Sequence, residues 1–225
     1  KDGHRKIITL EDPIEYQIKG ITQVQVNPKV GLTFSAGLRS MLRHDPDIMM
    51  VGEIRDVETA QIAMRVSLTG HLVFSTLHTN DAPSAFARLV DMGVEPYIVA
   101  SSLECVIAQR LVRTICPKCA VPDTDAQHVV EAVAQARGMR SINPMKGNGC
   151  EYCLHTGYKG RTAIHEMLVI SHDLRAMVAA RADSSALRQQ AIAQGMTTLR
   201  KDGLRKVAQG VTTLEEVMRA TDTES

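Results

Sequence analysis

Three apolar runs of this chain are each followed directly by residues that could take part in chemistry. The runs cover residues 7–10, 48–51 and 72–77. The residues that follow them are, in chain order, Glu11 and Asp12, Gly52 and Glu53, and His78. A continuous apolar run of this length is typical of a strand buried on both faces of a parallel sheet, and open α/β sheets bind ligands beyond the carboxyl ends of such strands. The pattern therefore predicts that these side chains converge on one crevice.

These residue types fit the hydrolysis of a terminal phosphate. That reaction needs a carboxylate that orients a water, a divalent metal ion with carboxylates ordering its shell, and positive charge near the developing oxyanion. Glu11 and Glu53 are the candidate carboxylates, and Gly52 would let the backbone approach the ligand closely. His78, and His71 ahead of the third run, could donate hydrogen bonds to phosphate. A lone Glu or His at a strand end is more often solvated surface, but three such clusters in register favour a site.

Several arginines are candidates for the charge-stabilising role, namely Arg39, Arg43, Arg55 and Arg88. Two of them also have a purely structural explanation. Arg43 would end a predicted helix, where the helix dipole favours a positive charge. Arg88 would lie on a solvated helix face. The sequence leaves both interpretations open for these two residues.

A second group of residues has the spacing of a metal site. It consists of two C-x2-C pairs, Cys116 with Cys119 and Cys150 with Cys153. Two such pairs close a tetrahedral site of thiolates, which suits structural Zn²⁺ and leaves no open position for catalysis. Reduced, unligated thiols or an iron–sulfur site are the alternatives. Cys105 lies in an apolar stretch and is expected to be a small buried hydrophobic residue rather than a ligand.

Three predicted helices connect or follow the apolar runs. Their expected N-caps are Thr33 or Ser35, then Asp56, then Asn80 or Asp81. The first helix would extend to Arg43, the second would cover residues 57–68 and stop at Gly70, and the third would end before Gly93. Strands and helices that alternate at these lengths imply right-handed βαβ units, so we predict the α/β class with a mostly parallel sheet.

The rest of the chain has a different pattern. Residues 114–160 contain the paired cysteines and several prolines, with one predicted helix near residues 128–137. From about Ser171 onward the pattern is helical. Thr213 and Glu216 have the spacing of a capping box for the last helix.

Composition narrows the possible functions. The 225 residues include 26 basic and 25 acidic ones, and a net charge of +1 gives no overall attraction to nucleic acid or membrane surfaces. The apolar runs are too short to span a bilayer, and no signal peptide opens the sequence. Five cysteines in a chain of this length are not a secreted disulfide framework. The sequence begins at Lys1 without an initiator Met, so we expect a piece of a longer protein.

Three of these motifs resemble those of the type II secretion and type IV pilus ATPases. Residues 8–15 resemble the aspartate box of that family, residues 50–56 its Walker B motif and residues 69–80 its histidine box, in the family's order. Shorter matches follow at residues 109–113, 157–162, 202–204 and 214–217. The resemblance covers nearly the whole chain and is closest to the type II secretion branch.

The resemblance implies roles for individual residues. Glu53 would be the Walker B acid that orders water and Mg²⁺. Glu11 would be the second catalytic carboxylate, with Asp12 as its structural neighbour, and His78 would sense the terminal phosphate. The arginines that match functionally important arginines of the family are Arg39, Arg43, Arg55, Arg88 and Arg161. These would act in the same subunit or in a neighbouring one.

The resemblance also implies an architecture, partners and a location. We expect a RecA-like core over residues 1–113, a tetracysteine zinc lobe over residues 114–160 and a helical region over residues 161–225. The expected partners are ATP with Mg²⁺, further copies of the chain in a homohexamer, and inner-membrane secretion platform proteins. The expected location is the bacterial cytoplasm, with peripheral attachment to the inner membrane through those partners. Direct binding of nucleic acid is not expected.

A phosphate-binding loop of the form G-x-x-x-x-G-K-[ST] does not occur in the sequence. In the family this loop lies a short distance before the aspartate box. Its amides and its lysine hold the β and γ phosphates. We therefore expect that the chain alone binds ATP poorly and is inactive, although its parent protein hydrolyses ATP.

Other functions remain open at this stage. A type IV pilus extension ATPase would share these motifs, and genetic context would separate the two. A zinc-knuckle module that recognises nucleic acid belongs to another class. The near-neutral charge, the lack of Trp, only 3 Phe and 4 Tyr, and the strand-end carboxylates argue against such a module. A structural remnant without activity fits the isolated chain but not its parent.

Overall fold

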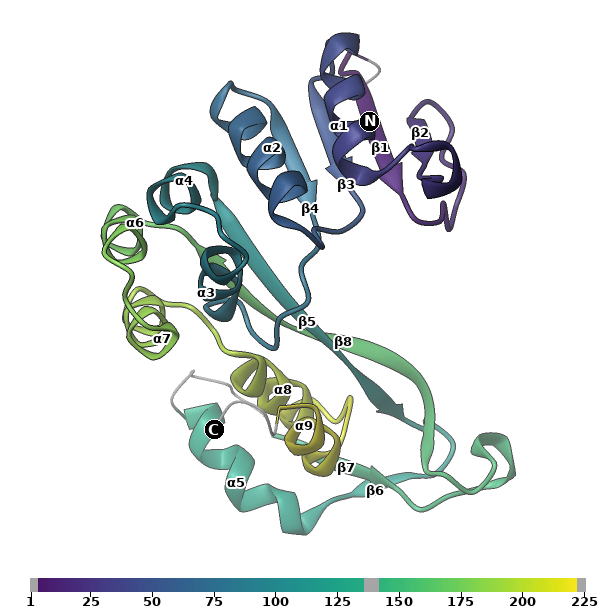
Figure 1. The fold of residues 1–225 in the computed structure, drawn as a ribbon. Coiled ribbons are helices and arrows are strands. Elements are labelled where there is room, and N and C mark those ends of the chain that lie inside the picture. Colours follow the sequence, from purple (N-terminus) through teal and green to yellow (C-terminus); the bar gives the residue numbers. More distant parts are fainter. Residues whose placement is uncertain (1–3, 136–141, 222–225) are drawn as a thin grey trace. The chain divides into compact units, whose positions relative to one another are not determined.

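The computed structural model describes residues 4–135 and 142–221. The chain folds into two compact units, whose elements are labelled in Figure 1. Unit 1 comprises residues 1–79, 83–104 and 170–188, and unit 2 comprises residues 80–82, 105–169 and 189–225. Each unit is therefore built from segments that are far apart in the sequence. The division into three functional parts stays a prediction.

Unit 1 contains a four-stranded sheet. Its strands are β1 (Ile7–Glu11), β2 (Thr22–Gln25), β3 (Ile48–Val51) and β4 (Leu72–Ser75). The strands lie in the order β2-β1-β3-β4, and every neighbouring pair is parallel. The α/β class and the predicted strands are confirmed. The polar strand β2 is not among those predictions, because its alternating Thr and Gln residues lack an apolar run.

Burial differs among the three predicted strands. Ile8, Leu10, Met49 and Val51 are buried, as expected for inner strands. The expectation of burial on both faces is wrong for β4, where Phe74 is 54% exposed. In the described part of the chain, β4 forms one edge of the sheet, and an edge strand has a neighbour on one side only.

Unit 1 also contains several helices. They are α1 (Phe34–Met41), α2 (Val57–Leu68), α3 (Ser84–Asp91), α4 (Pro96–Ser102) and α6 (His172–Ala179), while α7 (Ser184–Ala193) continues into unit 2. Two predicted N-caps are confirmed, since Thr33 Oγ1 accepts from Ala36 N at 3.2 Å and Asp56 Oδ1 accepts from Thr59 N at 2.7 Å. The predicted extension of the first helix is a separate 3₁₀ turn, Leu42–His44.

The predicted cap of the third helix is wrong. Pro83 precedes α3 and makes no side-chain cap bond, and neither Asn80 nor Asp81 occupies the cap position. Asn80 Oδ1 instead accepts a hydrogen bond from Arg110 Nη2 of strand β5 (Cys105–Ile115) at 3.1 Å. The side chain of Asn80, which the local pattern predicts as a helix cap, therefore makes a long-range hydrogen bond instead.

The core of unit 1 fixes the strands that carry the predicted site. Helix α1 lies so close to β1 that a Cβ at Gly37 would be 2.8 Å from both methyl carbons of Leu10. The buried cluster around this contact includes Ile8, Leu10, Phe34, Leu38, Met41, Met49 and Val51. Burial of this apolar surface stabilises the sheet and sets the positions of the residues that follow β1 and β3.

Unit 2 is built on a long antiparallel ribbon. Its elements are β5, β6 (Ala120–Pro122), α5 (Thr124–Gln135), β7 (Met145–Gly147), β8 (Tyr158–Val169), α8 (Leu199–Ala208) and α9 (Leu214–Thr221). Strand β5 pairs with β8, and β6 pairs with β7, both antiparallel. The helical pattern after Ser171 is confirmed. Helix α5 begins earlier than predicted, and residues 136–137 lie outside the described part.

The last helix is joined to the ribbon by a buried carboxylate. Thr213 Oγ1 caps α9 by accepting from Glu216 N at 3.3 Å, which is one half of the predicted capping box. The carboxylate of Glu216 is fully buried and accepts instead from Arg113 Nη2 of β5 at 2.6 Å. The guanidinium of Arg113 also stacks on the ring of Tyr158, 4.0 Å from its centroid.

None of the helices in the described ranges is long and apolar enough to cross a membrane.

Candidate functional site

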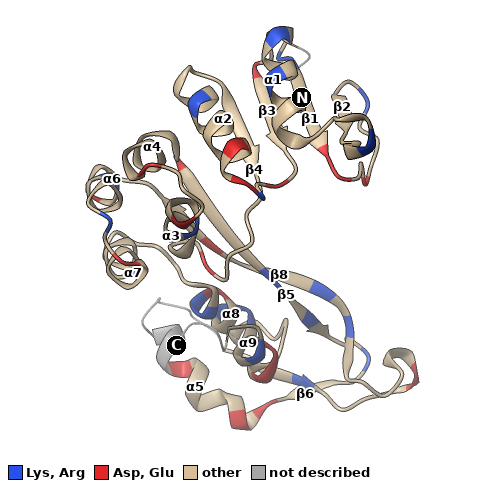
Figure 2. Cartoon of the chain, in the orientation of Figure 1, with Lys and Arg blue, Asp and Glu red and all other residues tan. Residues whose placement is uncertain are grey.

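The carboxyl ends of β1 and β3 meet at one edge of the sheet. Leu10 pairs with Val51, and Gly52 N donates to Leu10 O at 2.7 Å. A Cβ at Gly52 would lie 3.2 Å from that carbonyl oxygen and 3.4 Å from Glu11 Cα, so glycine permits the close approach of the two strand ends. Acidic residues follow both strands at this edge (Figure 2).

Glu53 lies between two cationic or potentially cationic groups. Arg55 Nη2 is 2.5 Å from Glu53 Oε1, and His78 Nε2 is 3.5 Å from Glu53 Oε2. The Glu53 side chain is 16% exposed, so it is partly shielded from solvent. The hydrogen bond from Arg55 lowers the pKa of Glu53 below its usual value, burial opposes this effect, and His78 adds to it. The carboxylate is therefore ionised at neutral pH.

Arg55 also links Glu53 to the neighbouring strand end. Arg55 Nη1 lies 3.7 Å from Asp12 Oδ2, and Asp12 follows Glu11 beyond β1. The structure therefore brings together Glu53, Arg55, His78 and Asp12, as the sequence predicts. Among the candidate arginines, Arg55 is the one that contacts Glu53 in the described part of the chain.

The backbone carbonyls at the carboxyl end of β3 accept hydrogen bonds from hydroxyl groups at the carboxyl end of β4. Ser75 Oγ donates to Val51 O at 2.8 Å, and Thr76 Oγ1 donates to Gly52 O at 2.6 Å. Ile54 N donates back to Thr76 O at 3.0 Å. These bonds fix the segment that carries Glu53. The sequence motifs do not predict this role for Ser75 or Thr76, although hydroxyl residues at a strand end are a signal for it.

Glu11 is held separately at the same edge. Thr9 Oγ1 donates to Glu11 Oε1 at 2.6 Å, and Gln23 Nε2 of β2 donates to the same oxygen at 2.9 Å. The strand register places Glu11 next to Gly52, but its carboxylate is bonded to β1 and β2 rather than to Glu53. Gln23 belongs to β2, which has no apolar run to predict it, so its contact with Glu11 is a finding of the structure.

Two candidate arginines lie on or after α1. Arg39 pairs with Glu58 in the first turn of α2. Arg43 lies in the 3₁₀ turn whose His44 carbonyl accepts a hydrogen bond from Lys6 Nζ. Because Lys6 precedes β1, this turn lies at the amino ends of the strands, whereas Glu53 lies at their carboxyl ends.

The remaining candidates are also not gathered around Glu53. His71 precedes β4, and its Nδ1 is 3.0 Å from Thr69 Oγ1, so it too lies at the amino edge of the sheet. Arg88 is exposed in the last turn of α3. Arg161 is exposed on β8 in unit 2, opposite Arg113 in the ribbon register.

The paired cysteines form one compact cluster. Their sulfur atoms all lie within 4.8 Å of one another. Cys116 Sγ is 3.9 Å from Cys150 Sγ, Cys119 Sγ is 3.9 Å from Cys153 Sγ, and the sulfurs of Cys150 and Cys153 are 3.8 Å apart. Four sulfurs bound tetrahedrally at about 2.3 Å from one ion lie about 3.8 Å from each other. The sulfur positions therefore fit a single tetrahedral metal ion.

The backbone supports this cluster. Cys150 N and Gly157 N donate to Cys153 Sγ at 3.2 and 3.3 Å. Burial opposes ionisation of Cys153, but these bonds outweigh it and lower the pKa of the thiol to about 6. Cys105 takes no part in the cluster, and the expectation that it is buried is wrong, because it begins the ribbon strand β5 with its side chain exposed.

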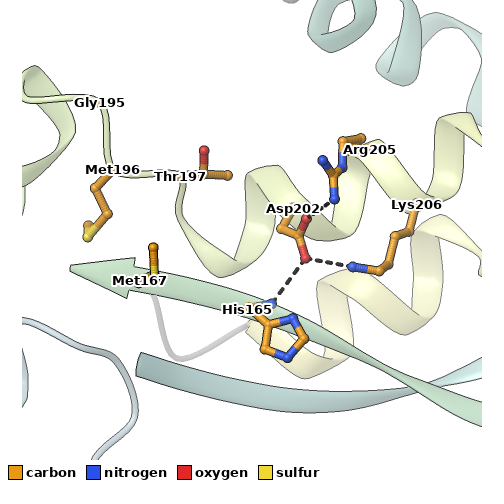
Figure 3. A pocket seen from close by; sticks show the side chains of 8 residues that line it. All are labelled: His165, Met167, Gly195, Met196, Thr197, Asp202, Arg205 and Lys206. Atoms are coloured by element: carbon orange, nitrogen blue, oxygen red, sulfur yellow. Dashed lines mark hydrogen bonds and ion pairs between the residues drawn. The ribbon is translucent and has the colours of Figure 1, made fainter. Parts of the chain in front are cut away.

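A cavity of about 340 Å³ lies in unit 2 between β8 and α8 (Figure 3). Asp202 forms one wall, where Oδ2 accepts from His165 N at 3.1 Å and from Lys206 Nζ at 2.7 Å. Arg205 Nη2 is 3.0 Å from Asp202 Oδ1. The charged side chains of Asp202, Arg205 and Lys206 pair with one another, and the bond from His165 N connects Asp202 of α8 to β8.

Comparison with known proteins identifies related sequences along nearly the whole chain. The family model described as "Type II/IV secretion system protein" matches residues 1–219. The Type II secretion system ATPase E of Vibrio cholerae serotype O1 is 51% identical over 219 residues, which is 97% of this chain and 43% of that protein. The Type IV pilus assembly ATPase PilB of Thermus thermophilus is 52% identical over 217 residues, which is 95% of this chain and 24% of that protein.

A solved structure has a similar fold. The crystal structure of the pilus retraction motor PilT with bound ADP superposes with a TM-score of 0.68 at 29% identity, covering 96% of this chain and 52% of that one. The chain thus spans less than half the length of the curated relatives described above.

Proposed function

Because the chain belongs to the type II/IV secretion system protein family, we propose that it is the carboxy-terminal part of an ATP-hydrolysing motor that drives type II protein secretion through pseudopilus assembly. The observation that carries this proposal is Glu53, an ionised carboxylate held between Arg55 and His78 at the carboxyl edge of a parallel sheet. A fixed carboxylate of this kind can orient a water toward a terminal phosphate.

Each neighbour of Glu53 has a part in this proposal. Glu11 is the second carboxylate at the site, and Gly52 keeps the ligand path clear of side-chain atoms. Asp12 holds Arg55, and His78 donates a hydrogen bond to the terminal phosphate. Mg²⁺ arriving with ATP would neutralise charge on the phosphates, and the carboxylates at this edge are oxygen ligands of the type it prefers.

The more distant candidates belong to an oligomer in this proposal. Arg39, Arg43, Arg88, Arg161 and His71 do not contact Glu53 within the described chain, so we assign them to phosphate contacts of a neighbouring subunit or to subunit boundaries. A closed ring can place an arginine of one copy at the site of the next. We propose a homohexamer in the bacterial cytoplasm, attached peripherally to the inner membrane through secretion platform proteins.

The cysteine cluster is proposed to hold Zn²⁺ in a structural role. A closed set of thiolates leaves no position for substrate, so the ion would stabilise the lobe of residues 114–160 rather than react. Binding energy of such an ion contributes directly to folding. This assignment is supported by the sulfur spacing and by the closed set of four cysteine ligands.

Pilus assembly is a second candidate function. It is favoured by the PilB of Thermus thermophilus, which is 52% identical to this chain over 217 residues. The proposed chemistry is the same for both functions, and only the filament would differ. Deletion of the gene in its source organism separates them, because either secretion or pilus extension would be lost.

The ATPase proposal is tested by Mg-ATP turnover of this chain and of the intact protein that contains a phosphate-binding loop. Turnover is expected in the intact protein alone, since the loop supplies amides and a lysine for the β and γ phosphates. Absence of turnover in the intact protein, under conditions that allow oligomers, would contradict the proposal.

A further inference from the structure

Gln23 of β2 connects the Glu11 carboxyl group to the loop of residues 12–21, which joins β1 to β2. Its Nε2 donates to Glu11 Oε1 at 2.9 Å and to Tyr16 O at 3.0 Å, and its Oε1 accepts from Ile18 N at 2.7 Å. All of these residues belong to unit 1. A single amide group therefore contacts both the second carboxyl group of the proposed site and the loop that follows it.

These bonds allow the Gln23 amide only one orientation. A glutamine amide donates from its nitrogen and accepts at its oxygen, and here each atom faces partners of the opposite kind. Turning the amide over would bring Oε1 toward the oxygens of Glu11 and Tyr16, and Nε2 toward the N–H of Ile18, so that attraction would be replaced by repulsion. The loop backbone therefore directs an N–H of Gln23 toward Glu11.

The Glu11 carboxyl group is oriented by two donors that share one of its oxygens. Thr9 Oγ1 donates to Oε1 at 2.6 Å, beside the bond from Gln23. Thr9 is buried and pairs with Gln23 in the register of β1 and β2, so the sheet holds both donors in place. The terminal torsion of a glutamate side chain is otherwise broad. The two bonds therefore restrict the rotation of the carboxyl group.

The loop depends on β2 for much of its support. Tyr16 is 82% exposed and Ile18 is 52% exposed, so these large side chains contribute little packing. Besides the bonds of Gln23, the side chain of Gln25 accepts from Ile14 N at 3.4 Å. The glutamines of β2 thus bond to the loop, and Gln23 alone of the two also bonds to the Glu11 side chain in the described part of the chain.

We propose that Gln23 is a positioning residue for the second carboxyl group of the ATP site: together with Thr9, it holds Glu11 in the orientation used during hydrolysis. This inference rests on the proposed ATPase function, in which Glu11 takes part. A group whose orientation is set before the reaction contributes more to the rate than one that must first find its position. The competing explanation is that Gln23 only fastens the loop to the sheet.

The experiment measures steady-state ATP hydrolysis by the intact protein carrying Gln23→Ala, Glu11→Ala or both substitutions. A carboxyl group that is free to rotate slows the reaction more than it weakens the binding of ATP. We therefore expect kcat of Gln23→Ala to fall about tenfold, while KM changes by less than about twofold. Because Gln23 acts through Glu11, the double variant should be no slower than Glu11→Ala alone.

Two further variants separate the bond to Glu11 from the bonds to the loop. Gln23→Glu keeps an oxygen that can accept from Ile18 N but replaces the donor facing Glu11 with an acceptor, so kcat should fall at least as far as in Gln23→Ala. Gln25→Ala removes a bond to the same loop but none to the Glu11 side chain, so kcat should stay within about twofold of the wild type. Melting temperatures from circular dichroism identify any variant that is unfolded.

The outcomes separate this inference from the proposed function. No turnover in the wild-type protein would overturn the proposed ATPase and this inference with it. Normal wild-type turnover with an unchanged kcat in Gln23→Ala would overturn the inference alone. So would rate losses of Gln23→Ala and Glu11→Ala that multiply in the double variant, or an equal loss of rate in Gln25→Ala, because a residue that only fastens the loop acts independently of Glu11.

Discussion

Replacing Glu216 with Gln would remove the charge from a fully buried carboxylate that joins α9 to the ribbon. Its oxygens accept from the side chain of Arg113 at 2.6 Å, from Arg113 N at 2.9 Å and from Arg219 Nη2 at 2.8 Å. Burial alone would raise the pKa of Glu216, but these hydrogen bonds outweigh it and lower the pKa from 4.5 to about 2. The folded state therefore strongly favours the charged form.

The size of this preference sets the expected loss of stability. A pKa displaced from 4.5 to about 2 corresponds to about 3 kcal/mol of stabilisation at neutral pH. Breaking a buried ion pair by removing one partner costs about 3–5 kcal/mol, which agrees in magnitude. Because the folded pKa lies below the unfolded one, this stabilisation is complete above about pH 5 and is lost as the pH falls toward 2.

Urea unfolding of wild type and Glu216→Gln, followed by far-UV circular dichroism because the chain lacks Trp, measures this effect. The difference in unfolding free energy between the two proteins should be about 3 kcal/mol at pH 7 and about 1.5 kcal/mol at pH 3. The exposed neighbour Glu215 provides a matched control, and Glu215→Gln should change stability by less than about 0.5 kcal/mol. A Glu216→Gln difference below 1 kcal/mol at pH 7, or one that does not change with pH, would refute this reasoning.

Three other substitutions test separate parts of the account. Gly203→Ala would place a Cβ 2.4 Å from Val217 Cγ1, so it should destabilise the α8–α9 packing by about 1–3 kcal/mol in urea unfolding. Asp56→Ala removes the cap of α2 and should cost about 1 kcal/mol by thermal unfolding, while a neutral result would show that the cap bond to Thr59 contributes little. Cys150→Ser should lower the zinc content measured by mass spectrometry well below that of wild type and lower the melting temperature, and an unchanged zinc content would contradict the metal assignment.

The sequence predicts best those features that depend on neighbouring residues. Helix α2 has the predicted bounds and the predicted cap, because Asp56 and the apolar spacing after it are local signals. The cysteine cluster is equally local in its signal, since each C-x2-C pair sets half of the site. The site around Glu53 is predicted because parallel strands bring their carboxyl ends to one edge.

Features that depend on distant pairing are harder to predict. The ribbon joins residues 105–115 to residues 158–169 across a long insertion, and no local pattern specifies that partner. Glu216 has the spacing of a capping-box residue, yet its carboxylate accepts a hydrogen bond from Arg113, which lies 103 residues earlier in the sequence. Asn80 fails as a helix cap for the same reason, because Arg110 binds its side chain. In each case a long-range contact overrides the local preference.

The most direct test of the proposed site compares ATP affinity with phosphate release for the intact protein and its Glu53→Gln variant, with Glu95→Gln as an exposed control. If Glu53 orients the attacking water, phosphate release should fall by about 100-fold or more while the Kd for ATP changes by less than about threefold. Glu95→Gln should match the wild type in both quantities. Wild-type rates of phosphate release in Glu53→Gln, or a loss of rate fully explained by lost affinity, would contradict the proposed role of Glu53.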